Sequence, residues 1–244
     1  MRTNALKLAA VAAVGTLGVG APRATADSLE LTSTFSGGIY ADGTTSPGFM
    51  NYYVGYSFPS SPVERRNYFI FDVSSVPGPV VSAKLKLYLP GAPFFPSGYV
   101  SSDPTEEFRV SGSAFPWTAY AEAFGGTATP PMLAAMFGTM GSSDAYGLVG
   151  VSGDASGTDI VIDLSLAAVT AINASPDGKF LVTGKLADIH PGMPGTIPSE
   201  LLFAYTDIPD PLMPMPRLEV EYVPAPRSML VLGAGCLLAR RRRR

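Results

Sequence analysis

The sequence contains very few residues that bind metals or form covalent cross-links, with one cysteine and one histidine among 244 residues. Cys236 lies in an apolar segment near the C-terminus, so residues 27–222 cannot form an internal disulfide. His190 has no second histidine or usable cysteine with which to hold zinc. No Gly-x-Ser-x-Gly elbow marks a nucleophilic serine. We therefore identify no catalytic residues, and we predict a protein that is not an enzyme and needs no cofactor.

Basic residues are also scarce between the two ends of the chain. Residues 27–222 contain all 20 acidic residues but only 8 of the 17 basic ones, which gives this part a net charge of −12. Such a surface repels phosphate groups, so a nucleic-acid partner is excluded. A structural Ca²⁺ stays open as an alternative, although the Asp154–Asp159 loop lacks the ligand spacing of a calcium hand.

Long apolar runs of the length that spans a bilayer, about 20 residues, are absent as well. The N-terminal run from Leu8 to Gly20 has 13 residues and follows two basic residues, Arg2 and Lys7. Two small residues, Ala24 and Ala26, then stand at the spacing that a signal peptidase accepts. Residues 1–26 are therefore predicted to be a signal peptide that is removed during export.

The C-terminal residues combine three features in a fixed order. Val223, Pro224, Ala225 and Pro226 form a box that the two prolines keep extended. An apolar helix over 228–239 is predicted next, and it enters the membrane. The chain then ends in a basic cluster that stays on the cytoplasmic side and leaves the domain outside, namely Arg240, Arg241, Arg242, Arg243 and Arg244.

This tail, residues 223–244, resembles the PEP-CTERM sorting signal of exopolysaccharide-producing bacteria. Ala225 departs from the glutamate that is usual in the box, and Arg227 stands where a small hydroxyl residue is usual. The resemblance implies processing by an exosortase in the inner membrane. It also implies a non-enzymatic protein of the cell surface or extracellular matrix, associated with exopolysaccharide and anchored in the inner membrane only before processing.

Between the two ends, apolar and polar residues alternate as in half-buried strands. The clearest case is 81–89, where the odd-numbered residues from Val81 to Leu89 are apolar. Arg217 to Tyr222 alternates in the same way. Further strands are predicted at 29–35, 51–58, 67–73, 106–110, 160–164, 179–183 and 201–205, separated by turns that include Ser36–Gly38 and Ser175–Gly178.

Helices are expected at two places only, Ser165–Ala174 and Pro131–Phe137. Many short strands with one or two short helices predict an all-β fold, a single jelly-roll-like β-sandwich over residues 27–222. The blocks Arg66–Ser75 and Val80–Tyr88 resemble the opening strands of sandwich domains in exported PEP-CTERM proteins and in some carbohydrate-binding-like jelly rolls. That resemblance supports the fold and not an activity.

Two groups of side chains offer alternatives to a purely structural protein. Aromatic faces suit the C–H surfaces of sugars, so one group is a candidate sugar-stacking platform, and core packing explains the same residues equally well. They are Tyr52, Tyr53, Tyr56, Trp117 and Tyr120. Asp103, Glu106 and Glu107 are either paired carboxylates for glycoside cleavage or a solvated strand start. A carbohydrate-binding module and a secreted polysaccharide hydrolase or lyase are therefore the alternative functions.

Overall fold

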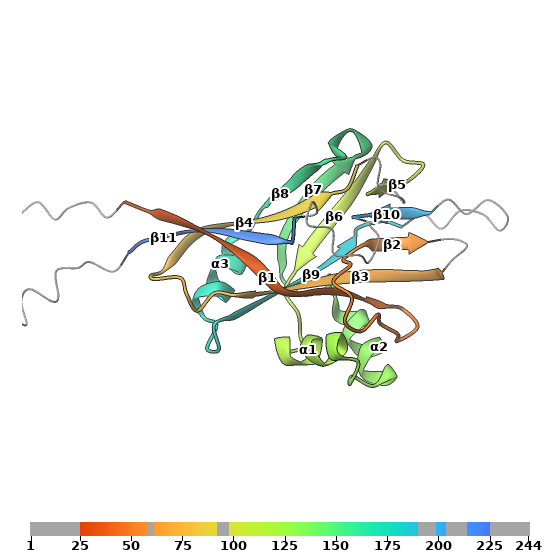
Figure 1. Ribbon diagram of the computed structural model, residues 1–244, viewed down its shortest axis with the longest axis horizontal. Helices are drawn as coiled ribbons and strands as arrows, with labels where there is room; N and C mark the ends of the chain where they lie inside the picture. Colours follow the sequence, from red (N-terminus) through yellow and green to blue (C-terminus); the bar gives the residue numbers. More distant parts are fainter. Residues whose placement is uncertain (1–24, 58–60, 92–97, 190–198, 204–213, 225–244) are drawn as a thin grey trace, which may run out of the picture.

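The computed structural model describes residues 25–57, 61–91, 98–189, 199–203 and 214–224 (Figure 1). Within these ranges the chain is mostly β, with three short α-helices and one 3₁₀ turn. In chain order the elements are β1 (Asp27–Tyr40), β2 (Val54–Ser57), β3 (Ser61–Asp72), β4 (Val80–Leu89), β5 (Tyr99–Val100), β6 (Thr105–Ser111), α1 (Trp117–Gly125), α2 (Pro130–Thr139), β7 (Ala145–Ser152), η1 (Gly153–Ala155), β8 (Thr158–Asp163), α3 (Leu166–Asn173), β9 (Lys179–Leu186), β10 (Glu200–Leu202) and β11 (Arg217–Tyr222).

One curled antiparallel sheet contains all of these strands, and β1 connects its two halves. The first part of β1 pairs with β11, from Asp27↔Tyr222 to Thr32↔Arg217. Its second part pairs with β3 instead, from Ser33↔Phe71 to Tyr40↔Arg65, and this ladder has a register shift between Ser33 and Phe35. One half of the sheet follows the order β1-β11-β4-β8, and the other half joins β3 to β2, β10, β5, β9, β6 and β7.

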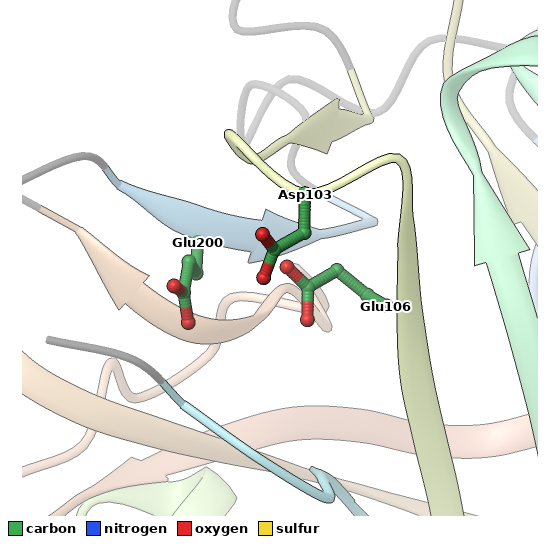
Figure 2. A group of neighbouring side chains, drawn as sticks. All are labelled: Asp103, Glu106 and Glu200. Carbon is green, nitrogen blue, oxygen red and sulfur yellow. The ribbon is translucent and has the colours of Figure 1, made fainter.

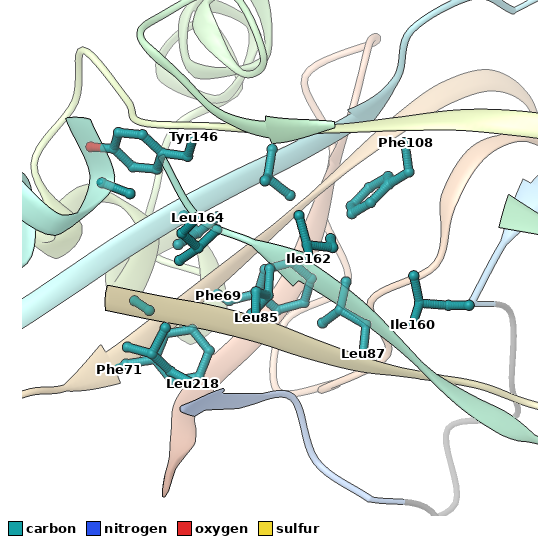
Figure 3. Packing of buried hydrophobic residues seen from close by; sticks show 14 of the residues in the cluster. Phe69, Phe71, Leu85, Leu87, Phe108, Tyr146, Ile160, Ile162, Leu164 and Leu218 are labelled. Atoms are coloured by element: carbon teal, nitrogen blue, oxygen red, sulfur yellow. The ribbon is translucent and has the colours of Figure 1, made fainter. Parts of the chain in front are cut away.

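The main hydrophobic core lies between these two halves (Figure 3). Leu85 and Leu87 of β4 face it from one half, while Phe69 and Phe71 of β3 face it from the other, and all four side chains are fully buried. The predicted alternation in 81–89 and in 217–222 is thereby confirmed for Ala83 to Leu89 and for Leu218 and Val220.

Val81 is an exception to the predicted alternation. Its side chain is 51% exposed, while the neighbouring Val80 is buried. The cause is a register shift at the end of the β4–β11 ladder, where Ser82 pairs with Glu221 but Val80 pairs with Tyr222. A bulge of this kind moves the following side chain to the other face of the sheet.

Gly37 and Gly38 lie within β1, close to its C-terminal end, so the turn predicted at Ser36–Gly38 is wrong. A Cβ on Gly37 would lie 2.8 Å from the hydroxyl oxygen of Tyr68, and a Cβ on Gly38 would lie 2.1 Å from Nε of Arg65. The two glycines therefore make room for large side chains of the adjacent strand β3. Close approach by a neighbouring group is a common reason for glycine inside a strand.

Arg65 is buried, with a side chain that is 1% exposed. Its Nη2 donates a 2.6 Å hydrogen bond to the carbonyl of Asn51, and its guanidinium carbon lies 3.8 Å from the centre of the Tyr53 ring. Asn67 binds the next carbonyl, that of Tyr52, at 2.7 Å. Nε and Nη1 of Arg65 have no acceptor among the described residues, so contact with the aromatic ring offsets part of the lost hydration of this charge.

Helices α1 and α2 cover the outer face of β1 and β3 and form a second, smaller core there (Figure 1). Ile39 and Ile70 of the sheet pack against Tyr120 of α1 and Met136 of α2. The predictions of α2 and α3 are confirmed within a few residues. Helix α1 was not expected, and the hydrophobic spacing of Tyr120 and Ala123 at i and i+3 is the signal that would have indicated it.

We expect Gly38→Ala to lower the free energy of unfolding by about 1–3 kcal/mol, because the new methyl group would displace the buried guanidinium of Arg65. Chemical denaturation monitored by circular dichroism measures this change. Gly138→Ala is the matched control: its Cβ would meet no atom within 4 Å, and it lies in the exposed part of α2. We expect the control to be neutral or to stabilise by about 0.5–1 kcal/mol. Equal effects of the two variants would contradict the packing described for Gly38.

Candidate functional site

The predicted processing residues lie at and beyond the ends of the described domain. Ala26 directly precedes β1, and Val223 and Pro224 directly follow β11. The backbone N–H of Val223 still donates a 2.9 Å hydrogen bond to the carbonyl of Pro79. The remaining predicted positions lie outside the described residues, namely Ala24, Ala225, Pro226, the apolar helix 228–239, Arg240–Arg244 and His190.

The aromatic residues predicted as a sugar platform are not brought together. Tyr52 packs in the main core against Phe69, while Tyr120 is fully buried in the second core, where burial raises its pKa to about 12. Tyr53 lies against Arg65. The prediction that these residues form one platform with Trp117 is therefore wrong, because core side chains cover the rings of Tyr52 and Tyr120, which cannot stack on a ligand.

Trp117 is the member of that group that lines a groove. The groove has a volume of about 230 Å³ and lies between the start of α1 and the turn that joins α3 to β9. Phe115 and Trp117 are half-buried beside it, and the stacked rings of Tyr146 and Phe180 lie deeper. Polar atoms come from the rest of the lining, which includes Ser113, Ser175 and Lys179.

Hydrogen bonds fix the side chains and the backbone around this groove. The indole Nε1 of Trp117 donates to Oδ2 of Asp177 at 3.3 Å, which connects α1 to the turn. Within the turn, Oγ of Ser175 accepts from the backbone N–H of Lys179 and donates to its carbonyl, both at 2.9 Å. The turn predicted at Ser175–Gly178 is confirmed, and it holds one wall of the groove in place.

Lys179 also forms an ion pair at the edge of the groove. Its Nζ lies 2.6 Å from Oδ2 of Asp72 on the neighbouring strand β3. The hydrogen bond from Lys179 and further bonds from the hydroxyl and backbone N–H of Ser74 lower the pKa of Asp72 to about 2. Asp72 thus bonds the turn that follows β3, and it balances the positive charge of Lys179 locally.

We expect Asp72→Asn to flatten the dependence of stability on pH in acid. Because the folded-state pKa of Asp72 is below its ordinary value, its ion pair stabilises the fold above about pH 4, and that contribution disappears as the pH falls toward about 2. Urea denaturation across this range should show wild type and variant converging at the acid end. In about 1 M salt, where the Debye length is ~3 Å, the difference in unfolding free energy between wild type and variant should become smaller. A constant difference at every pH would contradict this assignment.

A second candidate site is a group of three carboxylates from Asp103, Glu106 and Glu200 (Figure 2). Their ligand oxygens lie within 4.8 Å of one another. Glu106 is 3% exposed and Glu200 is 1% exposed, whereas Glu107 faces solvent on the other side of β6. The prediction of a solvated strand start is thus confirmed for Glu107 and wrong for Glu106. The carboxylate of Glu200, from β10, lies near that of Glu106.

Backbone pairing brings Glu200 to this place. Strand β10 pairs with β5, with Leu201 opposite Val100, and the chain after β5 turns back through Asp103 into β6. Oγ of Ser101 donates a 2.5 Å hydrogen bond to Oε1 of Glu106. Burial raises the pKa of the Tyr99 phenol, and the negative charges of the cluster raise it further. The sequence separation of nearly a hundred residues explains why Glu200 was not predicted.

The geometry of this cluster suits a small cation better than a sugar. In glycosidases, two catalytic carboxylates flank the scissile bond, so the substrate must have access to both of them. The burial of Glu106 and Glu200 prevents such access. Three crowded carboxylate groups repel one another, and carboxylate oxygens are the ligands that Ca²⁺ takes in proteins. Asp103, Glu106 and Glu200 are therefore the described residues that could hold a calcium ion.

We expect ~10 mM CaCl₂ to raise the melting temperature of the wild-type protein by roughly 5 °C, which corresponds to the affinity typical of extracellular calcium modules. The double variant Glu106→Gln/Glu200→Gln should show no such rise, because the amides remove two of the three charges. MgCl₂ at the same concentration is the control for ionic strength. An equal response of wild type and double variant to CaCl₂ would contradict a calcium role of the cluster.

Comparison with known proteins adds no functional assignment to this geometry. No protein-family model matches the chain, and no curated protein matches it either. Across the described ranges, no helix combines the length and the apolar character needed to cross a membrane. The function is therefore argued from the residues themselves.

Proposed function

We propose that the chain is an exported, non-enzymatic protein of the cell envelope or extracellular matrix that an exosortase sorts and that associates with exopolysaccharide. The observation that supports this most directly is where the folded domain starts and stops. Strand β1 begins at Asp27, one residue after the expected signal-peptidase site, and β11 ends at Tyr222, one residue before the sorting box. Both expected cleavage positions thus flank the domain without interrupting a strand.

The pairing of the two terminal strands also suits a domain that is cut at both ends. Asp27 and Tyr222 are opposite each other in the β1–β11 ladder, so the first and last residues of the folded domain lie side by side (Figure 1). Removal of residues 1–26 and of the tail therefore takes away no hydrogen bond of that ladder. Anchoring by the tail would leave the domain intact outside the membrane.

We further infer that the curled sheet is a β-sandwich of the jelly-roll type. Support comes from the two halves that enclose the main core and from the chain's repeated passage between them, for example from β3 to β4 and from β7 to β8. The pairing of the first strand, β1, with the last strand, β11, agrees with this inference. Such folds host many functions, so the fold itself supports no particular ligand.

In this proposal the partners act in sequence. A signal peptidase cuts after Ala26, the apolar segment 228–239 holds the precursor in the inner membrane, and the five arginines keep the tail end in the cytoplasm. An exosortase then cuts at the box that contains Pro224 and Pro226. The acidic domain is released to the surface, and its charge of −12 keeps it soluble there.

Mass spectrometry of the chain from an exosortase-containing host tests this order of events. We expect a mature N-terminus at Asp27 and a C-terminus near the box. Ala26→Trp should block the first cut, because the bulky ring does not fit a pocket that accepts alanine. Ala225→Glu, which restores the usual residue of the box, should increase the fraction of chains cut at the C-terminal side.

The matched control for the second cut is the same chain in a strain without the exosortase, where the tail should remain attached and the protein should stay in the membrane fraction. Protease added to intact spheroplasts should digest the domain in both strains. A domain that is protected from that protease, or a chain that keeps residues 1–26 in the cytosol, would overturn the proposal.

A further inference from the structure

We propose that the groove beside Trp117 binds one ring of a neutral sugar in a polysaccharide. This inference rests on the proposed function, because it names the site through which the exported domain would contact exopolysaccharide. The groove is lined on one side by Phe115 and Trp117 and on the other by the turn between α3 and β9.

The size of the groove limits the ligand to a small unit. Its volume of about 230 Å³ is below the ~300–1,000 Å³ of pockets that hold drug-sized molecules. Such a volume suits one pyranose ring, with the adjoining rings of the polymer outside the groove. A polysaccharide supplies many identical rings of this kind. A folded protein partner would instead need a broad contact area, and a groove of this size does not supply one.

The chemistry of the lining also suits a sugar ring. Indole and phenyl faces pack against the C–H surface of a pyranose, and hydroxyl, ammonium and carboxylate groups bind its hydroxyls. Trp117 and Phe115 supply the aromatic faces. Polar groups stand nearby in Ser113, whose Oγ lies 2.8 Å from the hydroxyl of Tyr120, and in Lys179.

The charges around the groove favour a neutral sugar over an acidic one. Lys179 is balanced by Asp72 at 2.6 Å, and Asp177 adds a second carboxylate that accepts the indole N–H of Trp117. The described charged groups at this edge therefore sum to a negative value, in a domain of net charge −12. A polysaccharide that carries carboxylates would be repelled.

The groove is held in its shape before any ligand binds. The bond between Trp117 and Asp177 joins the start of α1 to the turn, and Oγ of Ser113 accepts from the backbone N–H of Phe115 at 3.0 Å. Preorganised aromatic side chains lose little conformational entropy on binding. The groove can therefore bind a sugar ring without first having to order its own side chains.

The chain itself provides the probe for this site, because Trp117 is its only tryptophan. Selective excitation of indole fluorescence reports the groove alone. With the chain as secreted by its host, we expect a saturable change of the Trp117 emission on titration with the host's exopolysaccharide or with at least one of dextran, mannan and xylan. Alginate, an acidic polysaccharide, should produce no saturable change.

Affinity electrophoresis with the same polymers then measures the role of the side chain. We expect Trp117→Ala to weaken retention by about tenfold or more and Trp117→Phe, which keeps an aromatic face, to weaken it less. Phe49→Ala is the matched control, because Phe49 is a 46% exposed aromatic residue outside the groove. Melting curves of each variant establish that it is folded.

The outcomes separate this inference from the proposed function. If wild type and a folded Trp117→Ala variant bind the host's exopolysaccharide equally, the groove is not the site, although the association with exopolysaccharide stands. If the exported wild-type chain binds none of these polymers, both the groove and the association are overturned, while export is judged by the mature termini. If binding is lost in Trp117→Ala but not in Phe49→Ala, the groove is established as the sugar site.

Discussion

The structure depends on the way in which strand β1 divides its hydrogen bonds between two partners. Its first part pairs with β11 and its second part with β3, so one strand belongs to both halves of the curled sheet. Without that shared strand, the apolar faces of β4 and β3 would have no fixed arrangement across the main core. The same pairing places the start and the end of the domain next to each other.

Small residues in β1 allow this arrangement, and the groove beside Trp117 follows from it. Gly37 and Gly38 admit Tyr68 on one face and Arg65 on the other, so the sheet can carry a second core under α1 and α2 while a buried cation fixes the chain near Tyr53. Helix α1 then presents Trp117 toward the turn before β9. The groove thus arises where an outer helix meets an end of the sheet.

Local patterns in the sequence predicted much of the fold. Alternation identified β4 and β11, and the spacing of apolar residues identified α3, because the burial of one face imposes these periods directly. A short helix was also expected close to the observed position of α2. Other predictions were wrong where packing decided the conformation. Ser36–Gly38 has the composition of a turn but lies within a strand, and Val81 has the character of a core residue but is exposed by a bulge in the β4–β11 ladder.

The sequence by itself determined the mostly β character of the domain, its acidic charge and its lack of an internal disulfide, because composition and short-range periodicity suffice for each. It also predicted the processing signals, which are local motifs. Only the tertiary structure decided that Tyr52 and Tyr120 are core residues, that Trp117 lines a groove, and that Glu200 joins Asp103 and Glu106. These relations join residues far apart in the chain, and they follow from strand pairing and the curl of the sheet, which no short stretch of sequence specifies.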